Sequence, residues 1–269
     1  MPPARPRAEP LLSSALGNLP DFTFLELLPF IAVGFAAQLV DGALGMAFGV
    51  ISSTLLLSLG VPPAAASAGV HAVESFTTAA SAISHVAHRN VDWRLFARLV
   101  IPGIIGGILG AYAITSVAAE VARPLVLTYL SAIGLYLLWR GLKYPPRESH
   151  PRVVEPLGLA GGFLDAAGGG GWGAVVTSNL LVQGTSPRKA IGTVSTAEFF
   201  LTVTISATFI AALGVEALTV PTIGLLLGGV AAAPFGAFIA ARVPARPLLI
   251  AIGAILTITS AYGIYSAIA

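Results

Sequence analysis

The chain of 269 residues contains no cysteine and few charged side chains. Without cysteine it has no disulfide, no thiol nucleophile and no thiolate ligand for a metal. Charged residues make up 10% of the chain and hydrophobic residues 56%, with a mean hydropathy of +0.88. A soluble domain of this size cannot bury so much apolar surface, so the composition predicts an all-α protein that spans a lipid bilayer several times.

Several other features are missing. There is no Walker A sequence, which argues against ATP-driven pumping by this chain alone, and no extended polar region that would form a soluble domain. The formal net charge is +2 and the basic residues lie in connecting segments, which argues against a nucleic-acid partner. Four scattered histidines make a poor metal site, so we expect no metal and no cofactor.

Four acidic residues interrupt the apolar stretches in a regular way. Asp41 and Asp165 each lie in a glycine-rich segment, and Glu74 and Glu198 each follow 33 residues later. The two aspartates are therefore 124 residues apart, and so are the two glutamates. Because a buried acid is unfavourable within a bilayer, this spacing indicates a duplicated membrane protein whose function depends on these positions.

The duplication extends along the whole chain. We expect a disordered tail at 1–22 rather than a cleaved signal peptide, a first transmembrane repeat at 23–143, a cytoplasmic linker at 144–156 and a second repeat at 157–269. Matching glycines, prolines and an Ala-Arg-Pro-Leu phrase support this division. Helices are predicted near 24–40, 44–59, 63–88, 94–116, 121–142, 156–165, 170–183, 187–213, 218–241 and 245–267.

The first apolar stretch is too long for one crossing of the bilayer. Phe24–Leu59 would measure about 54 Å as a single helix, against a hydrocarbon core of about 30 Å. We therefore predict two short helices that meet at Asp41 and Gly42, either as a tight pair or as a re-entrant hairpin. The second half repeats the pattern around Asp165–Gly171.

Basic residues set the orientation. Arg140, Lys143, Arg147 and Arg152 make the linker cytoplasmic, which leaves the turn at Glu120 external. Five segments per half is an odd number, so the two repeats should be inverted in the membrane, as in carriers that work by alternating access. The alternative is eight plain helices in parallel repeats.

Two phrases and two helices carry a family resemblance. Asp41-Gly-Ala-Leu-Gly-Met-Ala-Phe-Gly49, its counterpart Asp165-Ala-Ala-Gly-Gly-Gly-Gly-Trp-Gly173 and the Glu74 and Glu198 helices resemble the TauE/SafE family of sulfite exporters and sulfonate permeases. The resemblance covers about residues 25–267. It implies a secondary carrier for small sulfur-containing anions, such as sulfite, sulfoacetate or another organosulfonate, in the bacterial cytoplasmic (inner) membrane.

An anion carrier with four buried acids needs positive groups of another kind. Unpaired N–H groups at helix N-termini bind oxyanions without a charged side chain, and glycine lets the backbone approach closely. We predict that the two glycine segments and nearby polar side chains hold the anion; the alternative is that the glycines only permit tight packing. The predicted binding residues are Gly42, Ala43, Leu44, Gly45, Gly168, Gly169, Gly170, Gly171, Trp172, Ser53, Thr177 and Asn179. For Trp172 the alternative is that its side chain only fills space left by the glycines.

The four acids are expected to couple transport to protons. Asp41 and Asp165 precede the second arm of each broken pair, where they would either cap that helix or act as protonatable gates. Glu74 and Glu198 lie deep inside long helices, where a carboxyl can be neutral near pH 7 and exchange protons; the alternative is a neutral glutamate hydrogen-bonded at a helix kink. His71 is a candidate partner of Glu74, three residues away, although Ser195 occupies the equivalent place in the second half.

The leading function is therefore a secondary transporter with protons as the coupling ion, and we do not expect an enzyme. A passive anion channel would share the glycine breaks but would not need acids that exchange protons. A membrane-embedded enzyme using His71 and Glu74 lacks a nucleophile, and a subunit of a larger complex is a further alternative. The sequence leaves open the substrate, the direction of transport and whether the chain forms a homo-oligomer.

Overall fold

A computed structural model describes residues 24–44, 46–143, 151–215, 220–240 and 245–268. The predicted tail at 1–22, Gly45 and most of the predicted linker lie outside the described residues. Within those ranges every regular element is helical and no strand is formed. The predicted all-α class is therefore confirmed for this part of the chain.

The helices occur in two sets that follow one another along the chain. The first set is α2 (Phe24–Leu44), α3 (Phe48–Ser58), α4 (Pro63–Ala87), α5 (Trp93–Ser116) and α6 (Ala119–Leu142). The second set is α7 (Glu155–Gly168), the π-helical turn η1 (Gly173–Thr177) that continues into α8 (Ser178–Val182), α9 (Pro187–Leu213), α10 (Val220–Ala240) and α11 (Ala245–Ile268).

Local chemistry explains where several helices begin. Pro63 and Pro187 occupy the first position of α4 and α9, where the missing N–H removes no hydrogen bond. Asp92 precedes α5, and its carboxylate accepts the N–H groups of Arg94 and Leu95 at 3.0 and 3.1 Å. These residues fix the starts of three long helices, two of which, α4 and α9, follow the broken pairs.

The first break lies later than the sequence predicted. We expected the two arms to meet at Asp41 and Gly42, but α2 continues as a helix to Leu44 and α3 begins at Phe48. Ala47 then turns the chain with a left-handed φ of 116°, which is unusual for a residue with a side chain. In the second half, Gly169, Gly170 and Gly171 make the equivalent turn with φ of 73°, 142° and 133°, which glycine adopts without strain.

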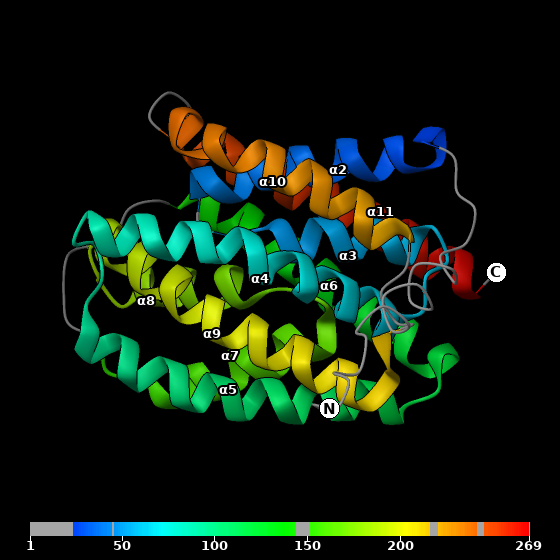
Figure 1. The fold of residues 1–269 in the computed structure, drawn as a ribbon, viewed down its shortest axis with the longest axis horizontal. Helices are drawn as coiled ribbons and strands as arrows, with labels where there is room; N and C mark the ends of the chain where they lie inside the picture. The colour runs from blue at the N-terminus through cyan, green and yellow to red at the C-terminus, as the bar shows by residue number, and fades with distance from the viewer. Residues whose placement is uncertain (1–23, 45, 144–150, 216–219, 241–244, 269) are drawn as a thin grey trace, which may run out of the picture.

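The two sets interlock by exchanging helices. The first helix of each set, α2 or α7, packs along the fourth helix of the other set, α10 or α5, and Figure 1 shows these two pairs on opposite sides of the molecule. The two helices of each pair approach closely because glycines lie at the contact. A Cβ atom at Gly106 would lie 2.9 Å from Phe163 N, and one at Gly228 would lie 2.7 Å from Phe35 N.

The central pair, α4 and α9, runs antiparallel. Ser75 meets Ser206 at 3.3 Å and Thr78 meets Thr202 at 3.4 Å, so residue numbers rise along α4 as they fall along α9. Thr202 also follows Thr78 by 124 residues, the spacing of the acids. The equivalent helices α4 and α9 therefore lie side by side in opposite directions, and the equivalent helices α6 and α11 also pack on each other.

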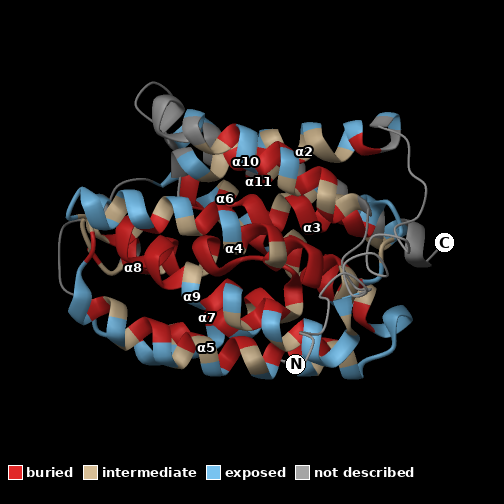
Figure 2. Ribbon diagram, in the orientation of Figure 1, coloured by how far each residue is buried: buried red, intermediate tan, exposed pale blue. Residues whose placement is uncertain are grey.

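The outside of the molecule is apolar, as a bilayer requires. Large side chains such as Ile101, Leu109 and Leu135 are more than half exposed, whereas buried residues concentrate where α3, α4 and α9 face one another in the middle of the molecule (Figure 2). Among the described residues, three helices have the length and hydropathy of membrane spans: 93–116, 119–142 and 188–213. With 11 residues in α3 and 14 in α7, these two helices are too short to cross about 30 Å of hydrocarbon.

Candidate functional site

The two breaks bring Asp41 and Asp165 to the starts of the second arms. The Phe48 N–H points to Asp41 Oδ1 over 3.4 Å, and the Trp172 N–H donates to Asp165 Oδ1 over 2.8 Å. In both halves the acceptor lies seven residues before the donor. Each aspartate thus belongs to the end of the first arm and satisfies an N–H at the start of the second, which is the capping geometry, and a role in proton exchange stays a prediction.

The second break packs directly on the start of α3. A Cβ atom at Gly49 would lie 2.7 Å from Gly170 Cα, and Ser53 Oγ donates a hydrogen bond to Gly169 O. The starts of the two second arms therefore lie together in the buried centre. The earlier glycine segment differs, because Gly42 is exposed within α2 and Ala43 and Leu44 continue that helix. In the described residues the two glycine segments therefore differ: the second forms a turn in the centre, and the first is partly helical.

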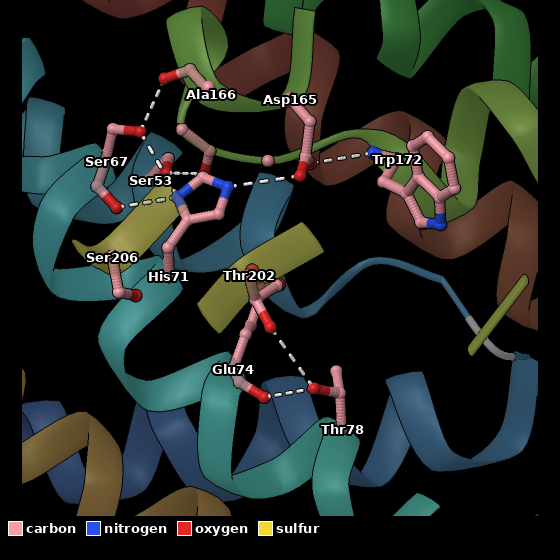
Figure 3. A network of polar contacts seen from close by, with 12 residues as sticks. Ser53, Ser67, His71, Glu74, Thr78, Asp165, Ala166, Trp172, Thr202 and Ser206 are labelled. Atoms are coloured by element: carbon pink, nitrogen blue, oxygen red, sulfur yellow. Dashed lines mark hydrogen bonds and ion pairs between the residues drawn. The ribbon is translucent and has the colours of Figure 1, made fainter. Parts of the chain in front are cut away.

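His71 links the two halves through Asp165. Its Nε2 lies 3.1 Å from Asp165 Oδ2, and Nδ1 lies 2.8 Å from Ser67 O (Figure 3). Because a backbone carbonyl only accepts, Nδ1 carries a proton and a further proton is shared between Nε2 and Oδ2. The side chains of His71 and Asp165 are 0% and 2% exposed, so this pair is shielded from water.

The two glutamates lie near the same place. Glu74 and Glu198 are buried, and a Cβ atom at Gly49 would lie 2.9 Å from Glu74 Oε1. Glu74 Oε2 has no hydrogen-bond partner among the described residues. Glu198 lies within electrostatic range of Asp41, Glu74 and Asp165. Glu74, Asp165, Glu198 and the imidazole of His71 are therefore buried in one region, with the half-buried Asp41 beside it.

The match to a protein family covers this whole arrangement. Residues 30–263 match the family model described as Sulfite exporter TauE/SafE. The chain belongs to the TauE/SafE family. It is 41% identical over 245 residues to the "Probable membrane transporter protein YtnM" of Bacillus subtilis (strain 168), a match that spans 88% of this chain and 82% of that protein. No solved structure matches the chain. The family resemblance predicted from the glycine and acid motifs is confirmed.

The remaining predicted binding side chains of this TauE/SafE protein are distributed unevenly. Asn179 Nδ2 donates to Val175 O within its own helix at 2.8 Å. Thr177 Oγ1, which is equivalent to Ser53 Oγ, is buried with no partner in the described part of the chain. Of the three predicted donors, Ser53 and Asn179 bind backbone carbonyls and Thr177 retains an unused hydroxyl.

Trp172 of this TauE/SafE protein fills space left by glycines. The residue is fully buried, and a Cβ atom at Gly103 would lie 2.8 Å from its Cη2 atom. Its indole Nε1 donates to Val194 O at 3.2 Å. These contacts correspond to the packing alternative, and a contact of Trp172 with substrate stays a prediction.

Two residues of this TauE/SafE site were not singled out in the sequence. Ser67 lies one helical turn before His71, and its Oγ donates to Ala166 O at 2.6 Å, so helical spacing from His71 could have indicated it. Tyr129 lies on α6 with its hydroxyl 3.4 Å from Gly170 O. No spacing or motif distinguishes Tyr129 from the apolar residues around it, so the sequence held no signal for its place beside the glycine turn.

Proposed function

We propose that this membrane transporter is a secondary carrier for a small sulfur-containing anion, such as sulfite, sulfoacetate or another organosulfonate, and that protons are the coupling ion. The observation that carries the proposal is the meeting of two helix starts, at Phe48 and Trp172, each with a carboxylate on its first N–H group. The family name supports a sulfur anion as the substrate.

The same N–H groups can serve either a carboxylate or a bound anion. A helix start attracts oxyanions because its N–H groups have no partner within the helix. Asp41 and Asp165 occupy that position through Oδ1. A sulfonate or sulfite oxygen can replace a carboxylate there when the carboxyl is protonated and its negative charge is removed. Binding of the anion is then linked to uptake of a proton.

The imidazole of His71 makes the second half the stronger anion site. With one proton shared between Nε2 and Asp165 Oδ2, the pair is neutral as a whole. A second proton leaves a neutral Asp165 and a cationic His71 beside the Trp172 N–H. The anion then meets one full positive charge and a helix start. Ser195 stands where a second imidazole would be, so we propose that the first half contributes less to binding.

Alternating access is the transport mechanism that suits this arrangement. Antiparallel pairing of the equivalent helices α4 and α9 supports inverted repeats in the membrane. The short helix α3 begins in the centre and the short helix α7 ends there, and both are too short to span the bilayer. We propose that the two halves exchange positions around the acids, and that the protein resides in the bacterial cytoplasmic membrane.

Uptake into proteoliposomes tests the proposal. Sulfite, sulfoacetate and sulfate are compared with and without an imposed pH gradient, using the wild type and Asp165→Asn. The wild type should accumulate sulfite or sulfoacetate at least several-fold faster with the gradient. In Asp165→Asn the amide oxygen still accepts the Trp172 N–H, so the protein should fold, but the gradient should no longer accelerate uptake.

A matched control is Glu155→Gln, which changes an exposed carboxyl on the same helix, α7. Glu155→Gln should keep the response to the gradient. Wild-type flux that ignores the gradient and does not saturate with substrate would contradict the proposal and favour a passive channel. Dependence on sodium in place of the gradient would replace protons as the coupling ion.

A further inference from the structure

An apolar groove lies directly beside the second break. Its volume is about 240 Å³, and its surface is almost entirely carbon. The groove lies between the last turns of α5, the first half of α6 and the end of α7. Its lining includes Ala113, Val126, Tyr129, Phe163, Ala167 and Gly168. For scale, an apolar cavity of about 150 Å³ holds a benzene molecule.

Tyr129 forms the wall between this groove and the glycine turn. A Cβ atom at Gly168 would lie 2.6 Å from Tyr129 Cδ1, and one at Gly171 would lie 3.3 Å from Tyr129 Cζ. The ring therefore lies along the turn on one side and lines the groove on the other. Residues with side chains at Gly168 and Gly171 would prevent this approach. The glycines thus have a role here beyond the freedom of their backbone.

The groove adjoins the glycine turn of the proposed anion site, with Tyr129 between them, and leads to the α5–α6 end of the molecule. Gly168 lines the groove and directly precedes the turn at Gly169–Gly171, which packs on α3. At its other end, Val117 and Ala122 flank the connection from α5 to α6. Positive charge in the opposite loops assigns that connection to the external side.

We propose that this groove receives the apolar part of the transported anion, with Tyr129 as the residue that sets how large that part can be. The inference rests on the proposed function, because it assigns the remainder of a molecule whose sulfur oxyanion lies at the break. The transported substrate is then an organosulfonate with a short hydrocarbon portion rather than inorganic sulfite. An anion without apolar atoms would leave the groove unused.

Burial of hydrocarbon gives a measurable signature. Each methylene group removed from water stabilises binding by about fourfold in affinity. From methanesulfonate to butanesulfonate, three added methylenes should lower the inhibition constant by about 60-fold if all are buried. The gain in affinity with chain length should stop when the groove is full. The inhibition constant of 4-toluenesulfonate should lie between those of methanesulfonate and butanesulfonate, because one ring fits the volume.

The test measures inhibition of sulfoacetate or methanesulfonate uptake in proteoliposomes by alkanesulfonates of one to six carbons. Ala167→Leu and Ala113→Leu each place a larger side chain in the groove. Ala160→Leu is the matched control, because Ala160 lies on α7 as well but is exposed on its outer face and does not line the groove. Tyr129→Ala removes the wall.

The ratio of the methanesulfonate and butanesulfonate inhibition constants should fall to within about threefold of one in both groove variants, and Ala160→Leu should keep the wild-type ratio. Tyr129→Ala should extend the trend to longer chains. Two groove variants are used so that misfolding of one leaves the result readable. No dependence on chain length in the wild type would overturn the proposal.

A steep trend that survives in both Ala167→Leu and Ala113→Leu would also overturn it, because the hydrocarbon would then enter surrounding lipid or another surface. The outcome is separable from the proposed function. If methanesulfonate and sulfite are transported with no dependence on chain length, the groove proposal alone fails. If none of sulfite, sulfoacetate and methanesulfonate is transported, the proposed function fails.

Discussion

At the scale of single residues, His71 and Asp165 are partners across the two halves of the chain. Replacing His71 by leucine leaves Asp165 Oδ2 without its partner in a buried place. Loss of one member of a buried ion pair lowers stability by about 3–5 kcal/mol, whereas removal of both charges is far less unfavourable. We therefore expect His71→Leu to lower the thermal unfolding temperature in detergent, and His71→Leu/Asp165→Asn to recover most of the loss.

The matched control for His71→Leu is Ser195→Ala, the equivalent position on α9. Ser195 is buried but uncharged, so its change should alter stability by no more than about 1 kcal/mol. Equal unfolding temperatures for the two single variants would show that the His71–Asp165 contact does not stabilise the fold. Failure of the double variant to recover would indicate that the loss comes from packing rather than from an unpaired charge.

The sequence predicted which acids matter more easily than which residues they meet. Asp41, Asp165, Glu74 and Glu198 could be singled out because an acid is unfavourable in an apolar stretch and is rare there without a function. The partner of His71 could not, because helical spacing offers Glu74 on the same helix and nothing in the sequence measures the distance to α7. Contacts between distant segments depend on how helices cross, which one sequence does not specify.

At the scale of elements, close packing of helix pairs depends on particular glycines. On α10, a Cβ atom at Gly228 would overlap the backbone of α2 at Ile31, whereas one at neighbouring Gly229 would lie 3.3 Å from the Thr77 methyl group. Gly228→Ala should therefore push α10 from α2 and destabilise the protein by about 1–3 kcal/mol. Gly229→Ala should be neutral or stabilise it by up to about 1 kcal/mol, since alanine favours helix.

Thermal unfolding of the two variants in the same detergent checks this difference. The two positions are adjacent, so helix propensity and hydrophobicity are matched. A loss of stability of equal size in both variants would mean that α10 has no room for a side chain at either position. No loss at Gly228 would mean that α2 and α10 lie further apart than the structure has them.

Helix existence was predictable and the place of the breaks was less so. The ten predicted helices correspond in order to the observed ones, because long apolar runs bounded by proline and basic residues leave few alternatives. Asp41-Gly42 has the composition of a helix start, yet α2 continues past it to Leu44. An aspartate near the end of one helix can accept an N–H group at the start of the next helix. The sequence pattern does not show whether such an aspartate lies at the end of the first helix or at the start of the second. The π-helical turn at Gly173–Thr177 likewise had no sequence signal.

At the scale of the whole molecule, the exchange of helices makes each half depend on the other. The first helix of one half packs on the fourth helix of the other, and the acids approach one another across the same boundary. The two halves together therefore form one candidate site, and serine rather than histidine at position 195 gives that candidate site unequal sides.

Membrane orientation can be measured directly because the chain has no cysteine of its own. Glu120→Cys, at the start of α6, and Arg246→Cys, at the start of α11, each introduce a single exposed thiol at nearly equivalent places of the two halves. A maleimide that cannot cross the membrane is applied to intact cells and to inverted vesicles. With inverted repeats, Glu120→Cys should react from outside and Arg246→Cys only in inverted vesicles.

Arg152→Cys, in the predicted cytoplasmic linker, is the control for the inner face. Reaction of both α6 and α11 thiols from one side would contradict inversion and support eight plain helices in parallel repeats, and alternating access between the halves would then lose its structural basis.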